Sequence, residues 1–330
     1  MFILREGSLL RPLLSAAFAA AAMAVSACSG NSLTPAAPSG AAMPLGAAAA
    51  ESFEFVTLDD ESDPTFNQLL GINNKGKIAG YFGMGIPGHP NKGYTLLAPY
   101  GQGNYVNENF PGSAQTQVTA INNHGDTAGF WVNNKNLNFG FIEWNGVFTS
   151  YKDPETRNGK VNQILGVNDS GTAVGFYVDA KGNSHGFTLD QATGKFQAVK
   201  PPGGGVSVSV TAINDAGDLT GFFTTASKQT YAFLRKGNHF STFGFPGGSN
   251  TQPLGINSGD QIVGSYDDGA GVMHGFLLSR PLSHAKWQSI DDPNGIGSTV
   301  VNGLNDRGEM VGFYTDAAGN TDGMLVVTQP

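Results

Sequence analysis

Short runs of alternating apolar and polar residues recur along the chain from residue 52 onward, and turn-forming residues bound each run. A period of two with such boundaries predicts short β-strands joined by tight turns. One segment with two of these strands occurs six times, as GINNKGKIAGYF from Gly71 and GLNDRGEMVGFY from Gly303. Its shared asparagines are Asn73, Asn122, Asn168, Asn214, Asn257 and Asn305, spaced 49, 46, 46, 43 and 48 residues apart. Such a period predicts a solenoid, a propeller or another repeat array.

Each repeat continues with a third and a fourth apolar stretch. The Asn-Gly pair at 145–146 is a two-residue hairpin signal, so these two strands are expected to pair within one sheet. The sixth repeat stops after three strands, at Val327, and an isolated strand of the fourth type, Phe53 to Leu58, precedes the first repeat. Joining the two completes a blade with strands from both ends of the repeat region and ties the ring shut, which an open array does not do. We therefore predict an all-β fold, a six-bladed β-propeller of four-stranded blades, in preference to an open β-array.

The recurring residues suit structural roles. The repeat asparagine and the glycine three positions later are typical of a turn with a positive φ. The fifth repeat has Gly259 only two positions after Asn257, so a different turn type is expected there. The small residue two positions before each asparagine is expected beside the propeller axis. A glycine inside strand two, such as Gly175, indicates a close contact over the backbone, for which the aromatic residues that follow it are the expected neighbours. We interpret those aromatics as core between blades rather than as a carbohydrate-stacking platform.

The N-terminal part has a different character. Arg5 and Arg11 precede an apolar run from Leu13 to Val25, which predicts a secretory signal over residues 1–27. The residues Val25-Ser26-Ala27-Cys28 resemble the lipobox of bacterial lipoproteins, and this resemblance implies that Cys28 is lipidated and tethers an exported protein to the cell envelope. The alternative is an ordinary signal cut after Ala27. Ser29 favours the outer membrane by the same resemblance.

Composition divides the remaining chain into a tether and a domain. Residues 28–51 are rich in Ala, Gly, Ser and Pro and predict a flexible tether, whereas residues 52–330 hold the six repeats. Cys28 is the only cysteine, so no internal disulfide is possible. Without the signal the chain has 16 basic and 25 acidic residues, a net charge of −9, which disfavours nucleic acid as a partner. We expect a monomer that contacts the membrane only through its lipid.

Three tripeptides extend the repeat. They are His185-Gly186-Phe187, His274-Gly275-Phe276 and Tyr231-Ala232-Phe233. With the Gly-Ile-Asn-Asp-x-Gly stretch, they make residues 52–330 similar to bacterial extracellular proteins with the HAF repeat. The resemblance implies an extracellular location and a repeat fold, and it brings no established activity.

The sequence contains no nucleophile elbow, zinc-protease helix motif or phosphate-binding loop. His185 and His274 occupy equivalent repeat positions, so structural roles are expected for both. The irregular loops that follow strands two and four share one face if strands alternate in direction, and binding residues often lie on such loops. The candidate binding residues on this face are Asp59, Asp153, Asp179, Asp267, Asp268, Asp291, Asp292 and Asp316. Three interpretations of these aspartates are open: they form a solvated surface, they bind calcium, or they attract a cationic partner.

We therefore favour a binding or scaffolding module, anchored to the envelope, that presents this acidic face to a glycan or a protein. No cofactor is expected, apart from the calcium considered above. The alternative is an extracellular hydrolase or lyase that acts on glycans or lactones through carboxylates or a metal near the axis. A purely structural envelope protein is a third hypothesis.

Overall fold

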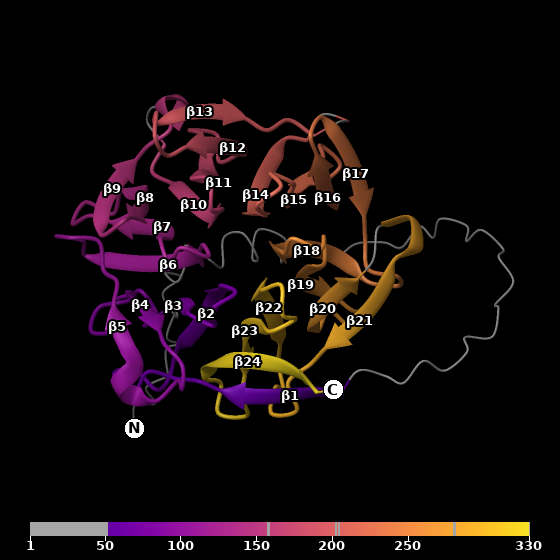
Figure 1. Cartoon of the computed structure of the whole chain (residues 1–330). Coiled ribbons are helices and arrows are strands. Elements are labelled where there is room, and N and C mark those ends of the chain that lie inside the picture. Colours follow the sequence, from indigo (N-terminus) through magenta and orange to yellow (C-terminus); the bar gives the residue numbers. More distant parts are fainter. Residues whose placement is uncertain (1–51, 157–158, 202, 204, 280–281, 330) are drawn as a thin grey trace, which may run out of the picture.

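The computed structural model describes residues 52–156, 159–201, 203, 205–279 and 282–329; the predicted signal, the tether and Cys28 lie outside them. Within these ranges, six four-stranded antiparallel sheets surround a central axis as blades (Figure 1). The prediction of an all-β, six-bladed propeller is confirmed.

The strands follow the predicted repeat. Blade 1 contains β2 (Asn67–Ile72), β3 (Ile78–Phe82), β4 (Lys92–Leu96) and β5 (Tyr105–Asn107). Blade 2 contains β6 (Gln115–Ile121), β7 (Thr127–Val132), β8 (Asn138–Trp144) and β9 (Val147–Tyr151). Blade 3 contains β10 (Asn162–Val167), β11 (Thr172–Val178), β12 (Ser184–Asp190) and β13 (Lys195–Ala198). Blade 4 contains β14 (Ser207–Ile213), β15 (Leu219–Thr224), β16 (Thr230–Lys236) and β17 (His239–Phe243). Blade 5 contains β18 (Ser249–Ile256), β19 (Ile262–Asp267), β20 (Met273–Ser279) and β21 (Lys286–Ile290). Short 3-10 helices are η1 (Gln102–Asn104), η2 (Pro154–Thr156) and η3 (Leu282–His284).

Blade 6 closes the ring with strands from both ends of the described chain. It contains β22 (Thr299–Leu304), β23 (Met310–Thr315), β24 (Thr321–Gln329) and, at its outer edge, β1 (Ser52–Thr57). β1 pairs antiparallel with β24 along its whole length, from Ser52 opposite Gln329 to Thr57 opposite Met324 (Figure 1). Phe53 and Phe55 of β1 pack against the buried core of the blade. The predicted shared blade is therefore present.

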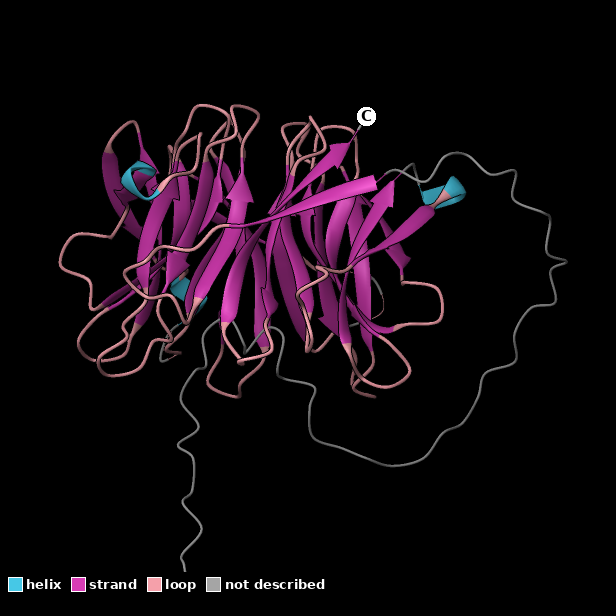
Figure 2. Cartoon of the chain, turned by 90° about the horizontal axis from the view of Figure 1, so that it is seen from below, coloured by secondary structure: helices cyan, strands magenta, loops and turns pink. Residues whose placement is uncertain are grey.

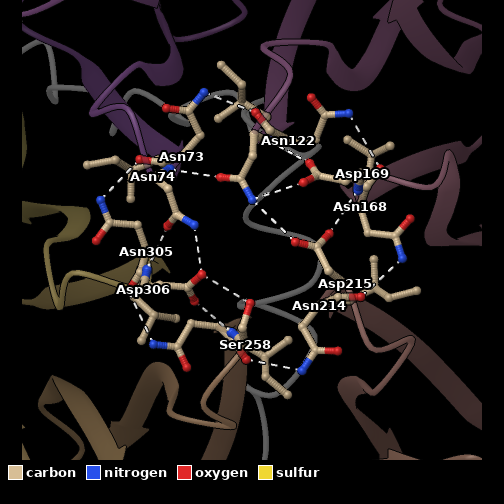
Figure 3. Close-up of a pocket in the computed structure, with 18 residues that line it drawn as sticks. Asn73, Asn74, Asn122, Asn168, Asp169, Asn214, Asp215, Ser258, Asn305 and Asp306 are labelled. Atoms are coloured by element: carbon tan, nitrogen blue, oxygen red, sulfur yellow. Dashed lines mark hydrogen bonds between the residues drawn. The ribbon is translucent and has the colours of Figure 1, made fainter.

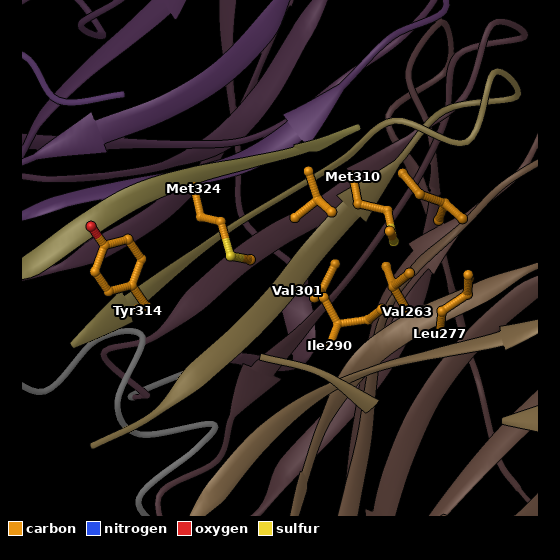
Figure 4. Close-up of a cluster of buried hydrophobic side chains, with 9 residues drawn as sticks. Val263, Leu277, Ile290, Val301, Met310, Tyr314 and Met324 are labelled. Atoms are coloured by element: carbon orange, nitrogen blue, oxygen red, sulfur yellow. The ribbon is translucent and has the colours of Figure 1, made fainter. Parts of the chain in front are cut away.

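The apolar core lies between neighbouring blades. Figure 4 shows one of its clusters, in which Val263 and Leu277 of blade 5 meet Val301 and Met310 of blade 6. Each blade thus buries its faces against the blades on either side, and no blade has a complete core of its own. Destabilising one blade is expected to destabilise the ring.

Small residues allow the innermost strands to approach closely, as predicted. A Cβ on Gly71 would lie 3.2 Å from the Cα of Ala120 in the next blade, and one on Gly166 would lie 3.1 Å from the Cα of Ala212. Contacts of this length leave no room for a larger side chain. The radial arrangement of the strands therefore requires glycine or alanine at this position.

The strand-two glycines are also crowded, but not by the residues that the sequence predicts. A Cβ on Gly175 would lie 1.9 Å from the carbonyl oxygen of Gln163 in strand one. One on Gly129 would lie 2.1 Å from the oxygen of Gln117 and 2.9 Å from the ring of Phe141 in strand three. The prediction of the following aromatics as neighbours was wrong, because successive side chains of a strand point to opposite faces of the sheet.

Candidate functional site

The propeller has two distinct faces (Figure 2). The loops from strand two to strand three and from strand four to the next blade lie on one face, which we call the long-loop face. The turns at the repeat asparagines and the hairpins between strands three and four lie on the other, which we call the turn face. Because all blades are antiparallel sheets, every repeat position returns to the same face in each blade.

A closed ring of hydrogen bonds joins the blades on the turn face. The Oδ1 atom of Asn73 accepts the backbone N–H groups of Lys75 and Lys77, each at 3.0 Å, and so shapes its own turn. Its Nδ2 atom donates to the carbonyl oxygen of Asn122 in the next blade at 3.0 Å. The same bond recurs around the ring at 3.0 to 3.5 Å and ends with Asn305 donating to Asn73. The six asparagines therefore shape the turns and also connect the blades.

The turn of the fifth repeat follows the common pattern. Asp260 donates its N–H to the carbonyl oxygen of Asn257 at 3.1 Å, as Gly76 does to Asn73 at 3.0 Å. Asp260 has a φ of 58°, where Gly76 has 77°. The expectation of a different turn type was wrong, because aspartate tolerates the left-handed conformation that glycine adopts in the other repeats.

The residue after each repeat asparagine forms a polar rim around the axis (Figure 3). The rim consists of Asn74, Asn123, Asp169, Asp215, Ser258 and Asp306. Five of its backbone N–H groups donate to the side chain of the next rim residue at 2.7 to 2.9 Å. The cavity that it surrounds has a volume of about 80 Å³, whereas a typical small-molecule site has roughly 300 to 1,000 Å³.

Residues at a β-bulge line a smaller cavity of about 30 Å³ deeper on the axis. In each blade the pairing of strands one and two shifts by one residue, as between Leu69 and Gly71, and the extra residue lines this cavity. These bulge residues are Leu70, Thr119, Leu165, Thr211, Leu254 and Asn302. The polar ones donate to a carbonyl oxygen of the next blade, as Thr211 does to Pro253 at 2.7 Å. They therefore add a second level of connection between blades.

Three of the eight candidate aspartates on the long-loop face shape the loops between strands two and three. They are Asp179, Asp268 and Asp316. The Oδ1 atom of Asp316 accepts the N–H groups of Ala318 and Asn320, each at 2.8 Å. Asn133 makes the same two bonds in blade 2, at 2.8 and 3.1 Å. These three aspartates thus stabilise their loops by accepting backbone N–H groups, as the repeat asparagines do in the turns of the turn face.

The remaining candidates have different surroundings. Asp153 and Asp292 are buried ahead of a proline, and each accepts the N–H group two residues later at 2.8 Å. Asp267 accepts the side-chain amide of Asn250 at 2.7 Å. Asp59 accepts the N–H of Gly323 at 2.8 Å. Burial, with repulsion from Asp322 and Asp316, raises the pKa of Asp59 to about 6.

The structure gathers seven of these aspartates into three groups, one each in blades 3, 5 and 6. In blade 3, His185 is 2.9 Å from Asp179 and lies close enough to Asp153 to act on its charge. In blade 5, His274 lies between Asp291 and Asp268. In blade 6, Asp59, Asp292 and Asp316 lie near enough to Asp322, which was not among the candidates, for their charges to interact. Asp267 lies outside the three groups.

Stacked rings recur on the long-loop face in four consecutive blades, 2 to 5. A ring at the end of strand two stacks on the residue opposite it in strand three, with centroids 4.9 to 5.6 Å apart and planes within 26°. The strand-three members, which we call the end rings, are Phe139, His185, Tyr231 and His274. Phe110 and Phe245, from the loops before blades 2 and 5, extend two of the stacks.

The end rings are accessible on the long-loop face. The side chain of His185 is 42% exposed, Tyr231 is 39% exposed and the side chain of His274 is 25% exposed. Each of these three has a polar neighbour: Tyr231 donates its hydroxyl to Gln229 at 3.0 Å, and both histidines pair with aspartate. In blades 1 and 6 the end-ring position holds Lys92 and Asp322 instead. The long-loop face thus presents a row of half-exposed rings with polar groups beside them.

The rim residues were not among the candidates from the sequence, and the tripeptides were not predicted to carry exposed rings. The residue after each repeat asparagine is Asn, Asn, Asp, Asp, Ser or Asp, and this polar pattern is visible in the alignment of the repeats. The first residue of the tripeptides is the end ring in blades 3, 4 and 5. The carboxylates nearest the axis, Asp169, Asp215 and Asp306, belong to the turn face and accept bonds between blades.

Among the residues that the structure describes, no group of three or more His, Cys, Asp or Glu side chains is placed to hold a metal ion. Calcium binding stays a prediction. No helix in the described ranges has the length and apolar character that a membrane span needs.

The chain was compared with known proteins in sequence and in structure. No protein-family model and no curated protein matches the chain. A mutant of AofleA from Arthrobotrys oligospora is 12% identical, covering 83% of this chain and 86% of its own, with a TM-score of 0.51. The Aleuria aurantia lectin in complex with Fucα1-6GlcNAc is 12% identical over 79% of this chain and 91% of its own, with a TM-score of 0.48. SapL1 lectin in complex with alpha methyl fucoside is 12% identical over 77% and 90%, with a TM-score of 0.49. At 12% identity the likeness to AofleA shows the propeller fold alone.

Proposed function

We propose that this protein is a glycan-binding propeller whose long-loop face is the binding surface. The observation that carries the proposal is the row of end rings in blades 2 to 5. The blade repeat places one half-exposed ring at the same point of four consecutive sheets. A structural ring needs no exposure, whereas the C–H face of a sugar stacks on an accessible ring.

The groups beside the rings suit the same ligand. Gln229, Asp179 and Asp291 offer acceptors for sugar hydroxyl groups next to Tyr231, His185 and His274. Charge-assisted hydrogen bonds to hydroxyl groups are short and orient the ligand, while stacking supplies contact area. Rings at one repeat position of several blades also allow a repeating polymer to engage more than one blade at once, which raises the overall affinity without new contacts.

Replacing Tyr231 by alanine is expected to weaken binding to the tightest ligand of a glycan array by about tenfold, or ~1.4 kcal/mol. The matched variant Tyr231→Phe keeps the ring and loses only the hydroxyl that donates to Gln229, so its affinity is expected to stay within about threefold of the parent, less than ~0.7 kcal/mol. Calorimetric titration of the purified protein measures both. Unchanged affinity after Tyr231→Ala, alone and combined with His185→Ala, would argue against the end rings as the contact surface.

We further propose that the propeller is exported and held at the cell envelope, and at the outer membrane, by a lipid on Cys28. The proposal rests on the resemblance of residues 25–28 to a lipobox and on the secretory character of residues 1–27. β1 begins on the turn face, where Ser52 lies opposite Gln329 at the end of β24, so a lipid tether joined to it would leave the long-loop face free to meet glycans away from the membrane. The Cys28→Ala variant is expected to move from the membrane fraction to the soluble fraction of expressing cells. Retention of this variant in the membrane fraction would rule out the lipid anchor.

A further inference from the structure

Blades 5 and 6 carry the same three side-chain positions on the long-loop face, with one change of charge. In blade 5 these positions are Asp268 in the loop after strand two, His274 at the end ring and Asp291 after strand four. In blade 6 the corresponding residues are Asp316, Asp322 and Asp59. The register supports this match, because His274 lies opposite Tyr266 and Asp322 lies opposite Tyr314.

In blade 5 the middle position is His274, a side chain that can carry a positive charge. The Nδ1 atom of His274 is 2.8 Å from Asp291, and its Nε2 atom is 3.5 Å from Asp268. Burial lowers the pKa of His274, but the two carboxylates outweigh burial and raise it above its ordinary value. Both ring nitrogens of His274 face a carboxylate, an arrangement that favours the protonated imidazole and its positive charge between the two aspartates.

In blade 6 the same place contains a third carboxylate instead of a cation. Asp322 is only 8% exposed, and burial together with repulsion from Asp316 raises its pKa. Asp59 and Asp316 are half-buried and reach solvent. Beyond burial, the charge of Asp316 raises the pKa of both Asp59 and Asp322, whereas hydrogen bonds from Asn320 lower the pKa of Asp316 itself. A charged Asp316 beside two partly buried carboxylates is unfavourable without a positive charge near them.

Asp292 adds an independent sign of a missing partner. Its side chain is 3% exposed, and its Oδ2 atom has no hydrogen-bond partner among the described residues. The charge of Asp292 also raises the pKa of both Asp322 and Tyr314, so this carboxylate lies within electrostatic reach of the same cluster. A buried carboxylate oxygen without a donor costs free energy that an N–H donor would recover.

We propose that the carboxylates of blade 6 bind a protonated amino group of the ligand, so that the preferred glycan contains free amino sugars. This inference rests on the proposed function, since the amino group belongs to a sugar chain that also stacks on the end rings. Asp291 and Asp292 are consecutive, and they join the His274 site of blade 5 to the carboxylates of blade 6. A chain of sugars can therefore stack on the ring of blade 5 and place an amino group in blade 6.

Two variants remove the carboxylate site, and each introduces a residue that another blade of this chain has at the same position. Asp322→His gives blade 6 the internal cation of blade 5. Asp316→Asn removes a charge and keeps the turn, because Asn133 makes the same backbone bonds in blade 2. Asp190→Asn is the control, since it removes one exposed aspartate from the hairpin between β12 and β13 on the turn face.

The experiment titrates the purified protein with a glucosamine tetrasaccharide and with its fully N-acetylated counterpart, at a pH where the amines are protonated. We expect the free-amine glycan to bind at least about tenfold tighter, a difference of ~1.4 kcal/mol. Asp322→His and Asp316→Asn should each reduce this preference to about twofold or less, and Asp190→Asn should leave it unchanged.

The outcomes separate the two proposals. Equal binding of both glycans, or a preference that survives Asp322→His, overturns the amino-sugar site and leaves the glycan-binding face standing. Binding of neither glycan, with no other ligand on a glycan array, overturns the proposed function and this inference with it. Thermal melting of each variant, with retention of a single cooperative transition, verifies that the fold is intact.

Discussion

Deleting residues 52–58 is expected to unfold the whole propeller rather than one sheet. The deletion removes β1, exposes the full edge of β24 and uncovers the core under Phe53, Phe55 and Val56. Burying a large apolar side chain stabilises a fold by about 1.5 to 3 kcal/mol, so the loss is comparable with a typical total stability of about 5 to 15 kcal/mol. Thermal melting followed by circular dichroism should show a midpoint lowered by more than about 10 °C, or no transition.

A circular permutant is the control for this deletion. Moving residues 52–58 to follow Gln329 through a short hairpin keeps the antiparallel register, because Ser52 already lies opposite Gln329. The permutant is expected to regain most of the lost stability. A deletion variant that melts like the parent would contradict the closure of the ring by the N-terminal strand.

Replacing Gly175 by alanine is expected to cost about 4 kcal/mol or more, an exceptional value for one methyl group. The added Cβ would lie 1.9 Å from the oxygen of Gln163 and 3.0 Å from the Cα of Ile164. Both atoms belong to the backbone of the paired strand, so β10 and β11 would have to separate, and no rotamer change relieves the clash. Urea unfolding of the purified variant gives the change in free energy of unfolding.

Gly269 provides a matched substitution. A Cβ at this position would meet no atom within 4 Å. Gly269→Ala is therefore expected to change the free energy of unfolding by less than about 0.5 kcal/mol. Similar costs for the two variants would show that the strand-two glycines are not required by close packing.

The repeat pattern was sufficient to predict the architecture. Alternation, the spacing of the asparagines and the hairpin signal at Asn145-Gly146 are local features, and together they placed the blade boundaries and the shared sixth blade correctly. The turn of the fifth repeat was missed because aspartate can replace glycine at a positive φ, as Asp260 does. The neighbours of the strand-two glycines depend on how strand two pairs with strand one, as Gly175 does with Ile164, and the alternation does not reveal this pairing.

The candidate site was harder to predict for a physical reason. Aspartate on a loop has several roles, and a sequence does not say which one a residue performs. Asp179, Asp268 and Asp316 shape loops first, and their grouping with His185, His274 and Asp322 depends on pairing between strands two and three. The end rings occupied a recognised repeat position, but their exposure depends on packing between blades, and that is a property of the assembled ring.

The most direct test of glycan binding by the long-loop face is the crystal structure of the protein with its tightest-binding glycan. We predict a sugar stacked on at least one end ring of the long-loop face, with Tyr231 or His185 beneath it and a neighbouring carboxylate or amide bound to a hydroxyl group. A sugar bound at the turn face, over the rim of Asn74 and Asp306, or on the outer strands away from every end ring, would contradict the assignment of the long-loop face as the binding surface.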